Sequence, residues 1–134
     1  MTAPSKPWHG ILVATALPMR PDGRGELQPD FYAYGEHVAW LAANGCHGVV
    51  PNGSLGEYQT LSREDRARVV RTAIDASPDG FVVMPGVAAY GADEARRWAE
   101  QAAEAGCPVV MLLPPNSYRA DTRAVIAPSC FLIT

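Results

Sequence analysis

Short apolar runs alternate with amphipathic segments along this chain of 134 residues. The apolar runs are rich in β-branched residues, which is typical of strands that are covered on both faces of a sheet. The segments between them repeat apolar residues at spacings of three and four, the period of a helix with one buried side. The pattern predicts four strands, at Gly10–Leu17, Gly48–Pro51, Phe81–Met84 and Val109–Leu113. It predicts three helices, one after Asp30, one after Ser62 and one over Asp93–Ala105.

Polar residues and glycines mark the ends of these helices. Asp30 and Ser62 are predicted N-caps, because their side-chain oxygens can accept hydrogen bonds from amides of the first helical turn. Asp65 follows Ser62 at the spacing of a capping box. Asn44-Gly45 ends the first helix. The segment Pro18–Gly25 holds two prolines and two glycines and is predicted to be a loop.

The order of strand and helix predicts an α/β fold. Alternating elements of this kind form a parallel sheet with right-handed crossovers. Two architectures fit, an open doubly wound sheet or part of a TIM (β/α)8 barrel. A complete barrel needs about 200 residues or more. In the barrel case the chain is therefore the N-terminal half, with about four βα units, and leaves two sheet edges unpaired.

The chain divides into one domain and two short ends. Residues 1–9 contain two prolines and little periodicity, so we expect a flexible arm. Residues 10–126 form the partial barrel. A fourth helix after Thr122 would be broken by Pro128. Residues 127–134 (APSCFLIT) lack the amphipathic pattern that a barrel helix needs, and a premature stop or a frameshift near Ala127 would explain this tail.

Charge and composition exclude several classes of partner. Eleven basic and fourteen acidic residues give a net charge of −3, which argues against a nucleic-acid partner. No apolar run approaches the roughly 18 residues of a membrane span. The three cysteines form no CxxC pair and are expected to be small core residues. With no secretory signal at the start of the sequence, these features predict a cytoplasmic protein.

The basic side chains offer little for catalysis. The only lysine, Lys6, lies in the arm and is predicted to be a solvated charge. The three histidines share no metal-ligand spacing and are expected to be structural; they are His9, His37 and His47. Four arginines of the second helix are predicted to form a solvated face with neighbouring acidic residues; they are Arg63, Arg66, Arg68 and Arg71.

The segment Asn52–Tyr58 (NGSLGEY), directly after the second strand, is the main candidate for chemistry. Gly53 and Gly56 allow a tight turn and a close approach of the backbone to a ligand. Consecutive amides in such a turn can bind an anion. The Ser54 hydroxyl can bind a carboxylate or relay a proton. The alternative is a plain strand-to-helix turn, and neither a dinucleotide-binding nor a Walker motif is present.

The sequence GSLGE at residues 53–57 resembles the GTTGE or GSTGE motif of the dihydrodipicolinate synthase / N-acetylneuraminate lyase family. These proteins are Schiff-base class I aldolases on a (βα)8 barrel. Further similar segments occur in the same order and at matching spacing; they are Gly45-x-x-Gly48-Val49, Leu61-Ser62-x-Glu64-x-Arg66 and Pro85-Gly86-Val87. The resemblance covers roughly Gly10–Asp121.

The resemblance implies a site for a 2-oxo acid, usually pyruvate, at the carboxyl ends of the strands. In the family a lysine on the sixth strand forms an imine with the oxo acid, and a tyrosine after the fourth strand moves protons together with the loop hydroxyls. Carried over by position, Ser54 and Tyr118 are the catalytic candidates. Gly53, Ser54 and Leu55 are the substrate-binding candidates. No metal or organic cofactor is implied, and homo-oligomers are expected.

Three departures from the family pattern stand out. Leu55 replaces the second hydroxyl of the motif. Asn116 occupies the tyrosine position and has no acidic proton near neutral pH, while Tyr118 lies two residues further on. The imine-forming lysine is missing, because Lys6 cannot be desolvated in an arm. The leading interpretation is therefore a truncated lyase or aldolase, and the alternative is a non-catalytic half-barrel that self-associates or binds a partner.

Overall fold

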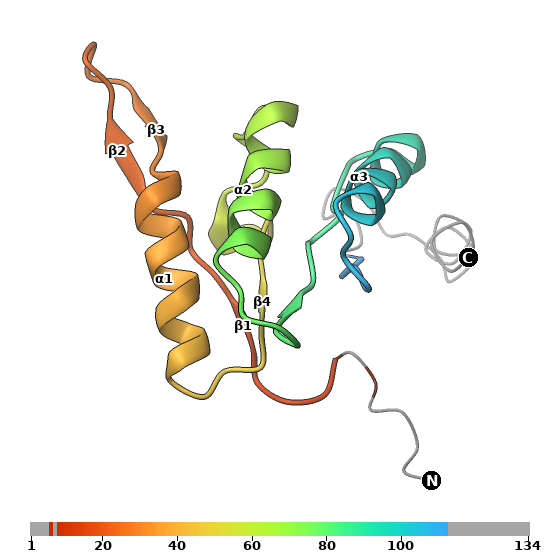
Figure 1. Ribbon diagram of the computed structural model, residues 1–134. Helices are drawn as coiled ribbons and strands as arrows, with labels where there is room; N and C mark the ends of the chain where they lie inside the picture. Colours follow the sequence, from red (N-terminus) through yellow and green to blue (C-terminus); the bar gives the residue numbers. More distant parts are fainter. Residues whose placement is uncertain (1–5, 7, 113–134) are drawn as a thin grey trace, which may run out of the picture.

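The computed structural model describes residues 6 and 8–112. Within them, three helices alternate with short strands (Figure 1). The elements in chain order are β1 (Leu12–Ala14), β2 (Met19–Pro21), β3 (Leu27–Pro29), α1 (Phe31–Ala43), β4 (Gly48–Val50), the 3-10 turn η1 (Ser54–Gly56), α2 (Arg63–Asp75), β5 (Val82–Val83) and α3 (Ala92–Glu104). Several predictions lie outside the described residues. They are the helix after Thr122, the two residues Asn116 and Tyr118 after the fourth strand, and the tail 127–134.

The main sheet is parallel and has the order β1-β4-β5. Val13 pairs with Val49, which pairs with Val83. A single parallel bridge between Gly86 and Met111 continues the series where the fourth strand is predicted. Each new strand is thus added on the same side of the sheet, whereas a doubly wound sheet reverses direction. The order therefore favours the opening part of a barrel over an open sheet.

Local capping explains where the helices begin. The Asp30 carboxylate accepts a hydrogen bond from the amide of Ala33 at 3.0 Å, and α1 starts at Phe31, directly after Asp30. The Ser62 hydroxyl accepts from the Asp65 amide at 3.0 Å and donates to the Asp65 carboxylate at 2.8 Å. Each such cap stabilises its helix by about 1 kcal/mol. Gly45, with a φ of +86°, follows the end of α1 as expected.

The prediction of a loop over Pro18–Gly25 was wrong for Met19–Pro21, which form a strand, and right for residues 22–25, which form the turn after it. The strands β2 and β3 form an antiparallel hairpin in which Met19 pairs with Pro29 (Figure 1). The Asp22 carboxylate closes the turn by accepting from the amides of Arg24 and Glu26 at 2.7 and 2.9 Å. Each strand is only three residues long and mostly exposed, so it carries no apolar alternation. The aspartate turn, rather than a hydrophobic pattern, is the signal for this hairpin.

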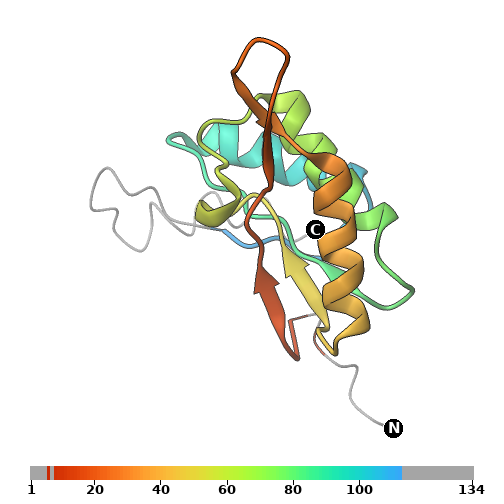
Figure 2. The same cartoon turned by 90° about the vertical axis from the view of Figure 1, so that its left-hand side faces the viewer.

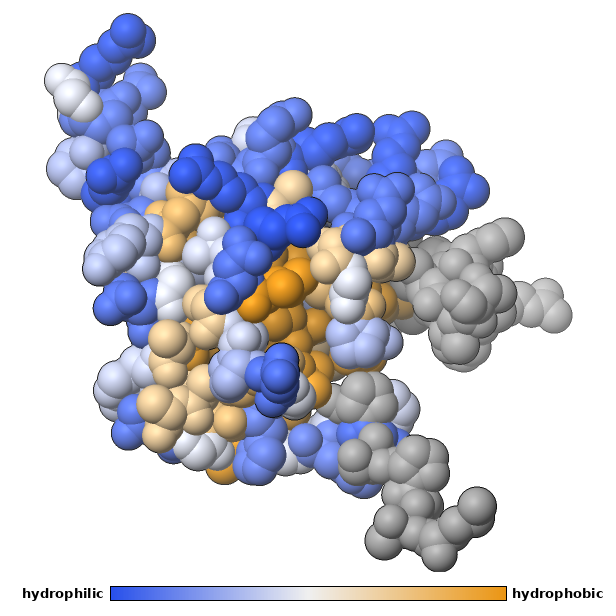
Figure 3. All heavy atoms as spheres, viewed as in Figure 1, coloured by the Kyte–Doolittle hydropathy of each residue, from blue (hydrophilic) through white to orange (hydrophobic). Residues whose placement is uncertain are grey.

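The main core lies between the sheet and the helices α1 and α2, which cover the same face (Figure 2). Its fully or nearly buried residues are Leu17, Tyr34, Val38, Leu41, Val49, Val69, Val70, Ala73 and Val83. Burying one such aliphatic side chain contributes roughly 1.5–3 kcal/mol. A second, smaller cluster of Val87, Trp98 and Ala99 attaches α3. Figure 3, which has the viewpoint of Figure 1, shows apolar surface near the centre of the visible face, between α2 and α3.

The opposite face of the sheet is narrow and only partly covered. Leu12, Gly48 and Val82 lie in one row across it. A Cβ at Gly48 would overlap the Val82 carbonyl oxygen, so only glycine fits at this middle position of the row. Ala14 is exposed and Leu12 half-buried. Among the described residues no strand pairs with the outer edge of β1. An unpaired edge beside a partly open apolar face is what an incomplete barrel presents.

Two cysteines and one histidine behave as the sequence predicts, while Cys130 lies outside the described residues. Cys46 and Cys107 are half-buried and pack against the main core. Burial raises the pKa of the Cys107 thiol to about 11, against the lowering effect of Arg71. The Nδ1 atom of His47 accepts a hydrogen bond from the Ile11 amide at 3.1 Å, which joins the starts of β1 and β4. His47 is therefore a structural residue.

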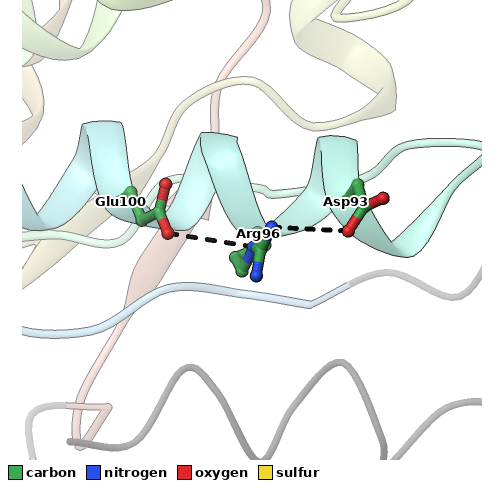
Figure 4. A network of polar contacts seen from close by, with 3 residues as sticks. All are labelled: Asp93, Arg96 and Glu100. Carbon is green, nitrogen blue, oxygen red and sulfur yellow. Dashed lines mark hydrogen bonds and ion pairs between the residues drawn. The ribbon is translucent and has the colours of Figure 1, made fainter.

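The outer side of α3 is a charged surface. Arg96 lies between Asp93 and Glu100, at 3.4 and 3.9 Å (Figure 4). All three side chains are largely exposed, so these ion pairs contribute little to stability. In the part of the chain that the structure describes, no helix has both the length and the apolar character to cross a bilayer.

Candidate functional site

The candidate loop begins where β4 ends. Pro51, Asn52 and Gly53 are buried, whereas Ser54 and Leu55 are exposed. The turn η1 is closed by two hydrogen bonds between backbone groups, from the Gly56 amide to the Gly53 carbonyl at 3.0 Å and from the Glu57 amide to the Ser54 carbonyl at 3.2 Å. The loop is therefore anchored at its start and presents its middle to solvent at the carboxyl end of the strand.

Backbone strain frames this loop on both sides. Asn52 has a φ of +56° and Glu57 a φ of +53°, and within the described range these are the two non-glycine residues with positive φ. Asparagine tolerates this left-handed conformation, whereas for glutamate it costs roughly 1–2 kcal/mol. Strained backbone of this kind concentrates at functional sites. Glu57 is the C-cap of η1, so its left-handed conformation ends the turn directly after the exposed segment.

The exposed part of the loop carries polar groups without backbone partners. Within residues 8–112, the amides of Ser54 and Leu55 donate to no other backbone group. Leu55 is 64% exposed, so its side chain is accessible at the tip of the turn. A hollow of about 310 Å³ next to the turn is lined by Ser54, Glu57, Tyr58, Gln59 and Thr60. The structure thus brings together Gly53, Ser54 and Leu55, while Tyr118 lies outside the described residues.

The loop packs closely on the neighbouring strand ends. The Gly86 amide donates to the Pro51 carbonyl at 2.8 Å. A Cβ at Gly86 would lie 2.6 Å from the Asn52 carbonyl oxygen, so a side chain cannot be accommodated there without moving the backbone. On the other side, a Cβ at Gly56 would lie 3.4 Å from the carbonyl oxygen of Thr15. The ends of β1, β4 and β5 therefore meet around the candidate loop.

The prediction that Arg66 belongs to a solvated face was wrong. The Arg66 side chain is only 4% exposed. Its guanidinium donates to the carbonyls of Gly86 and Ala88 at 3.3 and 3.5 Å. Burial lowers the pKa of Arg66 to about 10, against the raising effects of Glu94 and Tyr58. The other three arginines of α2 are exposed as predicted.

A signal for this burial is present in the sequence. Arg66 precedes Val69, Val70 and Ala73 by three, four and seven positions, so it lies on the apolar stripe of α2. A charged residue on such a stripe needs internal partners, because unpaired buried charges are costly. Lys6, in contrast, is exposed, with its Nζ atom 5.6 Å from the centre of the Trp8 ring.

The strands are added in chain order, and a glycine-containing loop lies over their carboxyl ends. These features define the opening units of a βα-barrel protein. Proteins of this class bind their ligands at the carboxyl ends of the strands. Within this class, the family model "Dihydrodipicolinate synthetase family" matches residues 7–127. The chain belongs to this family, as the GSLGE resemblance predicted.

Individual relatives support the same family. A 4-hydroxy-tetrahydrodipicolinate synthase of Agrobacterium fabrum is 36% identical over 120 residues, which are 90% of this chain and 40% of that protein. A second, from Methanosphaerula palustris, is 32% identical over 119 residues, or 89% and 40% of the two chains. The chain spans about two fifths of the length of these curated relatives.

A solved structure confirms the fold. The dihydrodipicolinate synthase of Cyanidioschyzon merolae superposes with a TM-score of 0.82 over 92% of this chain and 41% of the other, at 19% identity. The sequence expectation of an N-terminal partial TIM barrel is confirmed by this match and by the observed strand order.

Proposed function

We propose that the chain supplies the carboxylate-binding part of a lyase that acts on a 2-oxo acid of the pyruvate type. The observation that carries the proposal is the exposed Ser54-Leu55 turn, held by strained backbone at the meeting point of three strand ends. Family membership supports the reaction class, a carbon–carbon or carbon–oxygen lyase. The lysine that would form the imine is not among the residues of this chain's barrel, since Lys6 lies in the arm.

Each loop residue has a proposed role. The free amides at Ser54 and Leu55 bind the carboxylate of the oxo acid, as backbone donors in a tight turn bind anions. The Ser54 hydroxyl adds a hydrogen bond and relays a proton, and Gly53 lets the backbone approach the ligand. Leu55 provides an apolar contact where relatives of the GTTGE type have a hydroxyl. We propose Tyr118 as the second proton-transferring residue.

Binding of pyruvate to this chain tests the proposal. In amide NMR spectra of the 134-residue protein, pyruvate should shift the signals of Ser54, Leu55 and Gly56. Acetone, which lacks the carboxylate, should not. Ser54→Ala should weaken binding, and Leu55→Thr should strengthen it by about two- to tenfold, the value of one added hydrogen bond. Equal shifts with acetone, or no response at the turn, would refute carboxylate binding.

Borohydride trapping tests the location of the lysine. Reduction of an imine with pyruvate leaves a stable adduct that mass spectrometry detects. We expect no adduct on the 134-residue chain, because Lys6 is exposed and remote from the turn in sequence. A pyruvyl adduct on Lys6 would contradict the proposal that the imine forms on a residue outside this chain.

Self-association is the second candidate function. The outer edge of β1, which no strand among the described residues pairs with, favours it, together with the exposed Ala14 and the 61% exposed Ile11. Two halves of four units could close one eight-stranded cylinder with two-fold symmetry. Light scattering coupled to size exclusion distinguishes the cases. A discrete dimer that unfolds cooperatively supports this role, whereas a monomer or open-ended aggregates argue against it.

Two further points follow from family membership as proposals. We propose that the working protein is a homo-oligomer that binds a small-molecule oxo acid. We propose the cytoplasm as its location, because the thiols of Cys46 and Cys107 are unpaired in the described part of the chain and would need a reducing compartment.

A further inference from the structure

We propose that Arg66 is a positioning residue, which fixes the backbone of the Asn52–Gly56 loop by tying the end of β4 to the end of β5. The role of this loop in carboxylate binding rests on the proposed function. The effect of Arg66 on the shape of the loop does not, and the experiment below separates the two.

A closed circuit of hydrogen bonds runs through Arg66. The Arg66 carbonyl accepts from the Nδ2 atom of Asn52 at 3.1 Å. The Arg66 guanidinium donates to the Gly86 carbonyl at 3.3 Å. The Gly86 amide in turn donates to the Pro51 carbonyl at 2.8 Å, which returns the circuit to the residue before Asn52. One residue of α2 thus bonds, through its backbone and through its side chain, to the ends of two different strands.

The circuit acts where the backbone has the least freedom. Asn52 keeps a φ of +56°, and its carbonyl oxygen lies so close to Gly86 that a Cβ there would be 2.6 Å away. A left-handed residue persists only if its surroundings hold it in place. The side-chain hydrogen bond of Asn52 to Arg66 and the contact with Gly86 are the two interactions that do so.

The environment of the Arg66 side chain fits a role in positioning the loop better than a role in stabilising the fold. Within the described range, Arg66 has no carboxylate partner at ion-pair distance. Its charge is compensated by two carbonyl oxygens and by the faces of Trp98 and Tyr58, at 4.0 and 5.5 Å from the ring centres. For stability alone, an apolar residue on this stripe would serve as well. The planar fork of arginine is suited to holding two acceptors at fixed positions.

Replacement of Arg66 by methionine tests the proposal. The Arg66→Met variant keeps an unbranched apolar side chain on the stripe of α2 but loses the guanidinium, with its hydrogen bonds to Gly86 and Ala88 and its stacking on Trp98. Arg63→Met is the matched control, because Arg63 is exposed on the same helix and lies 5.7 Å from the same Trp98 ring. Arg66→Lys keeps the charge without the fork. Amide NMR spectra and hydrogen exchange are recorded without ligand, and pyruvate is then titrated into each protein.

We expect Arg66→Met to keep a cooperative unfolding transition and to move the amide signals of residues 52–56. The amides of Gly56 and Gly86 should exchange with solvent roughly tenfold faster, because the equilibrium constant for local opening rises by the same factor. The exchange rate of the Val38 amide in α1 should not change. Pyruvate affinity should fall by a similar factor. Arg66→Lys should recover part of both effects, and Arg63→Met should match the parent protein.

The outcomes separate the two ideas. Unchanged loop signals in Arg66→Met, or changes equal to those in Arg63→Met, would overturn the positioning role. If both Arg66 variants fail to fold, Arg66 is a general structural residue and the proposal is also wrong. If the parent protein does not bind pyruvate, the proposed function fails, and the ligand-free spectra still decide the role of Arg66.

Discussion

The guanidinium carbon of Arg66 lies 4.0 Å from the centre of the Trp98 ring, so a cation of α2 is stacked on an aromatic residue of α3. Trp98 is 8% exposed and belongs to the small cluster that attaches α3 to the rest of the chain. A desolvated cation–π pair contributes up to about 2 kcal/mol beyond the burial of the ring. This stacking therefore joins the third unit of the fold to the second.

Loss of the Trp98 ring should detach α3. We expect Trp98→Ala to lower the free energy of unfolding by about 3–5 kcal/mol, as for other buried aromatic residues. Trp40, 59% exposed on α1, provides the control, and Trp40→Ala should change stability by less than about 1 kcal/mol. Urea denaturation followed by circular dichroism measures both. Equal effects of the two substitutions would contradict the interior position of Trp98.

The buried hydroxyl pair of Thr15 and Tyr34 should give the chain an alkaline stability limit. The two oxygens lie 2.9 Å apart, and burial raises the pKa of Tyr34 to about 12, against the lowering effect of the Thr15 hydrogen bond. The folded state thus holds its proton more tightly than the unfolded chain does. Stability from this group is fully present below pH 10 and is lost as the pH rises toward 12, by about 2–3 kcal/mol.

Comparison with Tyr34→Phe isolates this effect. The difference in unfolding free energy between parent and variant should shrink between pH 10 and 12. Buried Arg66, whose pKa is lowered, acts in the opposite direction in both proteins and cancels in the difference. Tyr32→Phe, at a position 79% exposed on the same helix, is the matched control for the substitution itself. A pH-independent difference for Tyr34→Phe would rule out the raised pKa.

Gly86 should tolerate no side chain. Gly86→Ala places a Cβ 2.6 Å from the Asn52 carbonyl oxygen, and the required backbone shift should cost about 1–3 kcal/mol. At Gly53, in the same loop, no atom lies within 4 Å of the corresponding position, and its φ is −87°. Gly53→Ala should therefore leave stability unchanged or raise it by up to about 1 kcal/mol. Thermal melting curves of both variants check this contrast, and a reversed order would contradict the close approach.

Relief of the strain at Glu57 should stabilise the chain. Asparagine accepts a φ of +53° more readily than glutamate and adds less unfolded-state freedom than glycine. We expect Glu57→Asn to raise the free energy of unfolding by about 0.5–1 kcal/mol in urea titrations. A loss of stability instead would mean that the Glu57 carboxylate makes a stabilising contact that outweighs the strain.

Much of the fold could be predicted because its signals are local. The caps at Asp30 and Ser62 and the spacing of apolar residues placed the starts of α1 and α2 to the residue. The hairpin of β2 and β3 was missed, because its strands carry no apolar alternation and depend on the single turn at Asp22. The predicted strands are longer than β1, β4 and β5, although residues just beyond the observed ends still bond to the neighbouring strand, as the Thr15 amide does to the Val50 carbonyl and the Met84 amide to the Val49 carbonyl.

The candidate site was predicted only in part. The GSLGE turn was found from its glycines and its resemblance to a family motif, and the family is confirmed. The burial of Arg66 was missed, because its charge was given more weight than its place on the stripe of Val69 and Ala73. The contact between Gly86 and Asn52 joins residues 34 positions apart and depends on strand register, which no local pattern contains.

The open outer edge of β1 bears on how the chain behaves at high concentration. Within the described residues no strand pairs with its outward amides and carbonyls, so a compatible strand can add there and further strands can follow it. Growth stops only when an incoming strand curves back to meet the far end of the sheet. Curvature, rather than affinity, would then decide between a finite ring of chains and an endless fibre.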